Sequence, residues 1–426
     1  MTDWISQTNR RLQQAKAYAD EPETLKFSIF ILWLCMRDAE EDVCSTYRSL
    51  SEKSLDDAVA GMVLENVFGQ FDEKVQTSAA KMKIFESLAI RLRFLEDLFF
   101  LTDDAAVSRR ASFYEVSFED EGGFFINRAP KNRLAKGGEP FYRRAFKRAR
   151  MLPSKIGKYR IDLKVHDDAA GRVRMAAGKP FQLGAAVFDK LEFDLDYDND
   201  NHFVVTSTSC PGHFASLVGG IERASKEDCA GAIYPELTLP SSMIQDLRLA
   251  LASDQIITDG MSFVVAGSSH EKREDQLYEN ESVMLDMIGA PIARHKKLYR
   301  YSEVGIQERI ETGDTITVVL LADRAVSTAI CLDYCNIFDN PPFDHLDVDL
   351  LIVPSCGGVT TMRRHEDKAK FLYDQSKMKT VVVQQHYDEH NSPAPSDLIG
   401  YFLSPVDGGH VRENASSGEP WRRLTL

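Results

Sequence analysis

The stretch Ala325–Gly358, AVSTAICLDYCNIFDNPPFDHLDVDLLIVPSCGG, contains two short apolar runs separated by a polar loop rich in aspartate and proline. The runs, AVSTAICL and VDLLIVPS, have the length and composition of buried strands. Cys331 lies at the end of the first run, where a chain that leaves a strand of an α/β fold exposes a side chain to a cleft. A cysteine in this place is either a core thiol or a nucleophile.

Two segments upstream place charged residues at the ends of other predicted strands. CAGAIYPELTLP has Glu236 directly after an apolar run, and APIARHKKLYRYSEVGIQERIETGD has Lys297 in a basic, strand-like stretch. Glu236 could also be a surface carboxylate. Lys297 competes with its neighbour Lys296, and because side chains alternate along a strand, only one of the two lysines can point into a cleft.

The order Glu, Lys, Cys at strand ends resembles the nitrilase superfamily of carbon–nitrogen hydrolases. YPE matches the family's aromatic-Pro-Glu, RHKKL its basic-Lys-Leu, AICLD its Ile-Cys-x-Asp, and the final VPS the strand that follows the nucleophile. The resemblance covers roughly the C-terminal half of the chain, residues 191–426. It implies an α/β fold, an α-β-β-α sandwich that usually pairs into a homo-oligomer, and it selects Lys297, which directly precedes leucine.

The resemblance also implies a chemistry. Cys331 would be the nucleophile that forms a thioester, Glu236 the base, and Lys297 the cation that stabilises the tetrahedral intermediate, with the backbone N–H of Leu332 as a second donor. Glu308 would orient the lysine and the substrate, or else is a loop carboxylate. No metal or organic cofactor is needed. The family usually has Tyr or Trp where this chain has Leu332, so the substrate is left open, with an amide or carbamoyl group favoured over a nitrile.

Composition limits the function classes. The chain has 426 residues, 43% of them hydrophobic, and a formal net charge of −14, which argues against a protein built mainly to coat nucleic acid or an anionic membrane. Its seven cysteines include no CxxC pair, so we expect neither a disulfide framework nor a zinc site. The N-terminus lacks a signal-peptide hydrophobic region, and a cytoplasmic location is expected.

The N-terminal half carries no motif with a known chemistry. Apolar residues at three- and four-residue steps predict a helical domain over residues 1–110, which could dock a partner, pack on the hydrolase domain or mediate self-association. Residues 111–190 are expected to be a basic connecting region with a short strand pair around Gly122–Gly123. The acidic stretch LEFDLDYDND would then lead into the last domain, with HFVVTSTSC as its first strand.

A basic tract lies in the connecting region. Residues 131–164 hold twelve Lys or Arg against Glu139 and Asp162, with aromatic residues between them. Such a tract can bind a phosphate backbone and stack on bases. It could equally be an amphipathic helix, FYRRAFKRARML, or face an acidic surface on a partner or on this protein itself.

Two alternatives to hydrolysis therefore stay open. In one, the nitrilase-like domain is a ligand sensor or scaffold, and the N-terminal half docks a protein or nucleic acid. Nucleic-acid binding would then depend on four residues of the basic tract, Arg143, Arg144, Lys147 and Arg148. In the other, an amine rather than water resolves the thioester.

Overall fold

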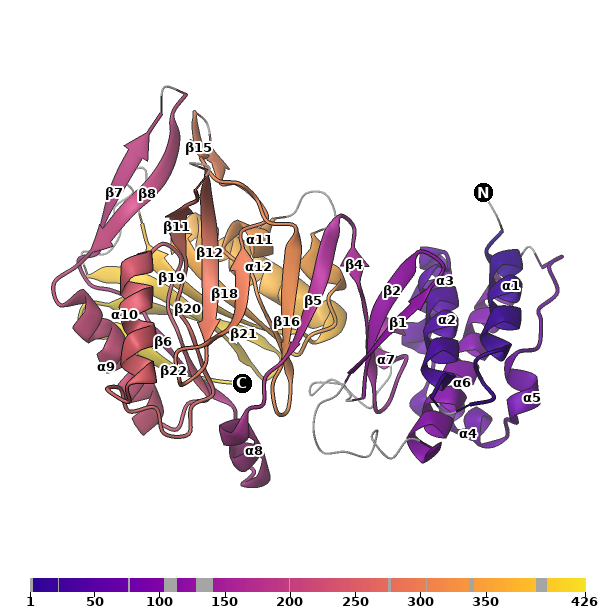
Figure 1. The fold of residues 1–426 in the computed structure, drawn as a ribbon. Helices are drawn as coiled ribbons and strands as arrows, with labels where there is room; N and C mark the ends of the chain where they lie inside the picture. The colour runs from indigo at the N-terminus through magenta and orange to yellow at the C-terminus, as the bar shows by residue number, and fades with distance from the viewer. Residues whose placement is uncertain are drawn as a thin grey trace. The chain divides into compact units, whose positions relative to one another are not determined.

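The computed structural model describes residues 3–21, 23–75, 77–102, 113–127, 141–198, 200–274, 277–303, 305–336, 341–387 and 397–426. The chain divides into two compact units (Figure 1). The first comprises Met1–Ile156 with Gln375–Lys377, and the second Gly157–Asp374 with Met378–Leu426. The expected connecting region, 111–190, is thus shared between them. Within the described residues, no helix is both long enough and apolar enough to cross a bilayer.

The first unit is mostly helical. Its helices are α1 (Trp4–Lys16), α2 (Leu25–Arg37), α3 (Glu41–Ser45), the 3₁₀ helix η1 (Thr46–Ser49), α4 (Glu52–Ala60), α5 (Leu64–Val67), α6 (Ser78–Thr102) and α7 (Phe141–Arg144). The sequence LKFSIFILWLCMR makes α2 apolar on nearly all sides, so this helix is buried within the bundle. α6 packs against it, and Phe85, Leu88 and Leu92 of α6 contribute to the same core.

A small antiparallel sheet completes this unit, in the order β1-β2-β3. Its strands are β1 (Phe113–Phe118), β2 (Glu121–Ile126) and β3 (Arg150–Pro153), and the two-residue strand β4 (Lys155–Ile156) follows them. The strand pair expected around Gly122–Gly123 is present, but its turn is at Glu119–Asp120, and both glycines lie inside β2. Gly123 is needed there because a Cβ would approach the Leu152 carbonyl oxygen and the Phe30 ring to under 3 Å.

The described part of the basic tract makes internal contacts. Residues 128–140 lie outside the described residues, and FYRRAFKRARML is helical only over α7. Arg143 and Arg144 are fully buried, and Arg144 forms an ion pair with Glu52 at 2.8 Å. Lys147 pairs with Asp56, and Arg148 with Asp97 at 3.4 Å. These contacts favour the reading in which the tract faces this protein's own acidic groups, and they give no support to a nucleic-acid surface.

The second unit is built on two large sheets. The first has the order β11-β12-β10-β9-β6-β22, with β13 paired to β12, and the second the order β21-β20-β19-β18-β17-β16-β5. The strands of the first are β6 (Gln182–Ala186), β9 (Gly231–Ile233), β10 (Phe263–Val265), β11 (Ser269–Lys272), β12 (Tyr278–Leu285), β13 (Pro291–Lys296) and β22 (Trp421–Thr425). Those of the second are β5 (Tyr159–Val165), β16 (Thr315–Leu320), β17 (Ala325–Thr328), β18 (Leu350–Gly357), β19 (Lys379–His386), β20 (Leu398–Val406) and β21 (Gly409–Ser416).

The two apolar runs of the Cys331 region become neighbouring strands. β17 and β18 pair in parallel, with Val326 opposite Leu350, and β19 continues the parallel arrangement on the far side of β18. Parallel strands are covered on both faces, which is why these runs are continuously apolar rather than alternating. Leu183, Val265 and Ile352 belong to the core between the two sheets.

Helices cover the outer faces. The helices of this unit are α8 (Ala169–Ala176), α9 (His213–Lys226), α10 (Ser241–Ala252), α11 (Leu332–Cys335) and α12 (Val359–Ser376), with the 3₁₀ helix η3 (Pro342–His345). Leu217 of α9 and Leu247 of α10 pack against the first sheet, and α12 contacts β18 of the second through a His365–Ser355 hydrogen bond (Figure 1). The expected α-β-β-α sandwich is therefore the architecture of this unit.

Two placements differ from the sequence expectation. The sandwich begins earlier than residue 191, because β5 and β6 occupy positions inside the two large sheets. HFVVTSTSC is a strand, β8 (His202–Ser209), but it does not open the first sheet, where β6 pairs in parallel with β9 instead. β8 belongs to a third, four-stranded sheet in the order β14-β15-β8-β7, with β7 (Glu192–Tyr197), β14 (Ser302–Glu303) and β15 (Ile306–Glu308).

Candidate active site

Cys331 lies at a strained turn between β17 and α11. Its backbone has φ 42° and ψ −101°, a conformation that residues other than glycine rarely adopt. The turn is held by the Cys331 N–H, which donates to the Pro354 carbonyl at 2.9 Å, and by the Cys331 carbonyl, which accepts from Tyr334 N–H at 3.0 Å. Strain of this kind persists only where the surrounding structure fixes it, and it clusters at functional sites.

Lys297 bridges two buried carboxylates. Its Nζ lies 2.8 Å from Glu236 Oε1 and 2.8 Å from Glu308 Oε2, and all three side chains are at most 3% exposed. Burial alone would lower the pKa of Lys297, but Glu236 and Glu308 hold it well above its usual value. Lys296, the alternative, is 44% exposed and pairs with Glu279 on the other face, so strand alternation separates the two lysines as expected.

Glu236 is held by three donors. Oε1 accepts from Lys297 and from Asn280 Nδ2 at 3.0 Å, and Oε2 accepts from the Cys356 backbone N–H at 3.1 Å. Burial raises the pKa of Glu236, opposed by Lys297 and by a hydrogen bond with the Cys331 side chain. A carboxylate with a raised pKa beside a thiol is suited to take up and return a proton near neutral pH.

Glu308 has a different environment from Glu236. Its Oε1 contacts His270 Nε2 at 2.8 Å, and its Oε2 accepts from Tyr301 N–H at 2.9 Å besides Lys297. His270 Nδ1 accepts the Val205 N–H, so the ring proton is on Nε2 and is donated to Glu308. Burial alone would raise the pKa of Glu308, but Lys297 and His270 hold it well below its usual range. The two carboxylates around Lys297 thus have pKa values shifted in opposite directions, and Glu308 stays ionised.

The Cys331 thiol shares a cavity with these groups. Burial, and then the neighbouring Glu236, raise the pKa of the thiol well above its usual value. Its Sγ lies 3.8 Å from the Cys356 carbonyl oxygen. The cavity has a volume of about 140 Å³, and among the described residues its charged and sulfur-bearing lining consists of Glu236, Lys297, Glu308, Cys331 and Cys356. The four side chains singled out in the sequence therefore lie together.

Leu332 is the first residue of α11 and follows Cys331 directly. The first N–H groups of a helix have no partner within the helix, so this group is available as a donor beside Cys331. Of the two other cysteines near Cys331, Cys335 is buried in α11. Cys356 lines the cavity and positions Glu236 through its backbone.

Sequence reasoning missed Asp333, which ties the Lys297 segment to the Cys331 turn. Asp333 is fully buried. Oδ1 accepts from Leu298 N–H at 2.7 Å and Tyr299 N–H at 3.0 Å, and Oδ2 contacts His295 Nε2 at 3.0 Å. One carboxylate next to the Cys331 turn thus fixes the backbone that follows Lys297. The AICLD motif contains this aspartate, but its partners become visible only in the fold.

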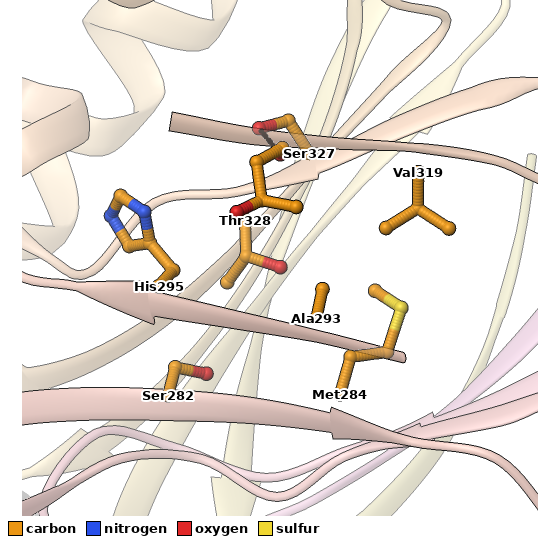
Figure 2. Close-up of a pocket in the computed structure, with 8 residues that line it drawn as sticks. Ser282, Met284, Ala293, His295, Val319, Ser327 and Thr328 are labelled. Carbon is orange, nitrogen blue, oxygen red and sulfur yellow. Dashed lines mark hydrogen bonds between the residues drawn. The ribbon is translucent and has the colours of Figure 1, made fainter. Parts of the chain in front are cut away.

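His295 in turn borders a second, much smaller cavity of about 10 Å³, enclosed by β12, β13, β16 and β17. Figure 2 shows the imidazole beside Thr328 on the side of the cavity opposite Met284 and Val319. The volume is that of about one water molecule. The lining near His295, which includes Ser282, is polar, and this cavity offers no room for a substrate.

We expect Asp333→Asn to destabilise the second unit by about 1–3 kcal/mol, because an amide N–H₂ would replace an acceptor at buried N–H donors. Turnover should fall with it, since the Lys297 segment loses its anchor. Urea unfolding of the full chain measures the first effect. Asp314→Asn, at a carboxylate that is 72% exposed, is the control. Equal unfolding midpoints for Asp333→Asn and the unmodified chain would contradict this role.

One group in the described part of the chain has metal-ligand geometry. The side-chain ligand atoms of Asp198, Asp200 and His202 lie within 4.8 Å of one another at the turn after β7. Asp198 already accepts the backbone N–H groups of Asp200 and His202, and Arg309 lies 3.8 Å from it. These contacts account for the cluster without a cation.

No protein-family model matches the chain, and no curated protein sequence matches it. Among solved structures it is similar to an amidase from Nesterenkonia sp., with 14% identity over 58% of this chain and 90% of that chain at a TM-score of 0.41. A mutant of that amidase in complex with butyramide has 14% identity over 59% of this chain and 92% of that chain, at a TM-score of 0.42. A glutamine-dependent NAD+ synthetase from Acinetobacter baumannii gives 18% identity over 57% of this chain and 45% of that chain, with a TM-score of 0.40. Another structure of the Nesterenkonia amidase is described as a nitrilase-superfamily member, the family that the four motifs resemble.

Proposed function

We propose that the second unit hydrolyses a non-peptide carbon–nitrogen bond, an amide or carbamoyl group rather than a nitrile, through a thioester on Cys331. The observation that carries this proposal is the Lys297 ammonium held at 2.8 Å by both Glu236 and Glu308 in the cavity that also contains the Cys331 thiol. A nucleophile, a proton carrier and a cation for the developing oxyanion are the groups that acyl transfer needs.

The raised thiol pKa decides how the reaction starts. Because burial and Glu236 disfavour a free thiolate, the thiol is protonated at rest and must lose its proton during attack. As Sγ bonds to the carbonyl carbon, a Glu236 carboxylate oxygen takes the thiol proton. The carbonyl π electrons move to oxygen, where Lys297 Nζ and the Leu332 N–H stabilise the charge.

Collapse of this intermediate breaks the C–N bond. Glu236 returns the proton to the departing nitrogen, which leaves as ammonia or an amine, and the acyl group stays on Sγ as a thioester. Water then enters, Glu236 takes one of its protons, and the resulting tetrahedral species expels the sulfur as the acid forms. The thiol recovers its proton from Glu236. Glu308, kept ionised by Lys297 and His270, moves no proton and holds the lysine in place.

Trapping of the acyl-enzyme tests the proposal. The full chain is incubated with primary amides and hydroxylamine, and ammonia release and hydroxamate formation are measured. Rapid quenching followed by peptide mass spectrometry should locate an acyl group on Cys331, with none on Cys335 or Cys356. Turnover with an acyl group on another residue, or an unchanged label in Cys331→Ala, would overturn the mechanism. If added amines release the acyl group from the Cys331 thioester faster than water does, the reaction is transfer rather than hydrolysis.

A further inference from the structure

The β7–β8 hairpin presents an apolar face to the candidate active site. Phe193, Leu195 and Tyr197 line the cavity from β7, and Phe203 and Val205 line it from β8. The register places Leu195 opposite Val205 and Tyr197 opposite Phe203. The stretch that carries this face was expected to be a mere acidic lead into the domain. Its letters FDLDY instead follow the two-residue period of a strand with one apolar face.

The acidic residues of the same strand are exposed and alternate with the apolar ones. Glu192, Asp194 and Asp196 are all exposed. On the cavity face, Tyr197 is 49% exposed, and Phe193, Leu195 and Phe203 are partly exposed, whereas Val205 is buried. Half-exposed aromatic and aliphatic side chains around a reactive thiol form a surface that an apolar ligand group can cover.

The hairpin is fixed to the reacting groups. Val205 N–H donates to His270 Nδ1, and His270 Nε2 donates to Glu308 Oε1. β15, which carries Glu308, pairs with β8 and sets Glu308 opposite Phe203. The apolar wall and the carboxylate that holds Lys297 therefore belong to one small sheet, and the wall has a defined position relative to the reacting groups.

Charge in the cavity restricts the ligand further. Of the described residues that line it, Lys297 is the only cation, and it is already paired with two carboxylates. With Glu236 ionised, these three groups carry one net negative charge. A carboxylate on the substrate would therefore find no free cation among the described lining residues, and burying an unpaired charge is strongly unfavourable.

We propose that this cavity takes neutral amides with an aliphatic or aromatic acyl group, and that the apolar face of the β7–β8 hairpin is its specificity element. The inference rests on the proposed function and narrows it. It excludes substrates that carry a carboxylate, such as N-carbamoyl amino acids, the ω-amides of dicarboxylic acids and glutamine.

A series of amides tests the proposal on the full chain. From acetamide to hexanamide, kcat/KM should rise by roughly fourfold for each added methylene until the cavity is filled. Phenylacetamide should be a good substrate. The monoamide of adipic acid, which has the same chain length as hexanamide but ends in a carboxylate, should be at least about tenfold worse than hexanamide. A kcat/KM that stays constant from acetamide to hexanamide, or a preference for the carboxylated amide, would overturn the proposal.

Leu195→Arg supplies the missing cation and should weaken the selectivity against the carboxylated amide. The ratio of kcat/KM for the adipic monoamide to that for hexanamide should increase by about tenfold or more, the size of one charge-assisted contact. Asp194→Arg, one residue away on the exposed face, changes the charge even more and should leave the ratio unchanged. Tyr197→Arg, at a half-exposed position, repeats the test independently of how well Leu195→Arg folds.

The outcomes separate this inference from the proposed function. If amides are turned over but neither Leu195→Arg nor Tyr197→Arg changes the ratio, the hairpin's role is overturned and the Cys331 chemistry stands. If none of the amides releases ammonia or acylates Cys331, the proposed function fails, and the substrate class fails with it.

Discussion

Cys331→Ala is expected to reduce amide turnover by at least about 10⁴-fold while leaving the fold intact. Loss of a nucleophile removes the covalent route entirely, and such losses reach about 10⁶-fold in other enzymes. Stability should change by only about 1 kcal/mol, because alanine removes one buried atom and adopts the same strained turn as cysteine. Initial rates of ammonia release and a thermal unfolding curve measure the two effects.

The chain offers its own matched controls. Cys335→Ala alters a buried thiol in α11, and Cys356→Ala alters a second thiol that lines the cavity. The contact that Cys356 makes with Glu236 uses the backbone N–H, which alanine retains. Both variants should keep activity within about threefold. Full activity in Cys331→Ala would end the mechanism, and inactivity confined to Cys356→Ala would move the nucleophile to that residue.

The site could be predicted as far as its residues follow local rules. Glu236 and Cys331 each come at or near the end of an apolar run, and Lys297 lies in a basic, strand-like stretch. The two-residue period of a strand allows only one of Lys296 and Lys297 to face the cleft, and the family resemblance, not the period, selects Lys297. Asp333 and His270 could not be assigned in this way. Their partners are the backbone N–H groups of Leu298 and Val205, and no local pattern shows which distant backbone groups a buried side chain will meet.

The errors in the fold have a common physical cause, because composition was used where periodicity or distant partners decide. The stretch from Glu192 to Tyr197 was treated as acidic, although every second residue is apolar and forms a strand face. For the basic tract, composition left several readings open, because Glu52 and Asp56, which pair with Arg144 and Lys147, come from a helix about ninety residues earlier. The helical domain was predictable because helical periodicity is local, whereas pairing of β5 and β6 in the large sheets is not.

Lys297→Met should have the second largest effect, and it should act on stability and turnover together. The substitution leaves the Glu236 and Glu308 carboxylates buried without their cation, and breaking a buried ion pair in this way costs about 3–5 kcal/mol. Loss of an oxyanion donor should reduce turnover by a further factor of about 10²–10³. Urea unfolding and initial rates measure the two effects, and Lys296→Met is the control. Its partner Glu279 keeps Arg273 at 2.8 Å, so both quantities should change little.

The stability loss in Lys297→Met should depend on pH in a defined direction. Without the lysine, burial raises the pKa of both carboxylates above their unfolded value of about 4.3. A group whose pKa is raised on folding stabilises fully below its unfolded pKa, and that stability is lost as the pH rises through the folded pKa. In the unmodified chain, Glu308 has a lowered pKa and stabilises above its unfolded pKa, a contribution that falls away on acidification. The raised pKa values in Lys297→Met therefore narrow the difference between the two proteins as the pH falls from 8 towards 5, whereas the loss of the Glu308 contribution begins only below its unfolded pKa. A difference in urea midpoint that stays constant over this range would show that Lys297 does not neutralise the two carboxylates.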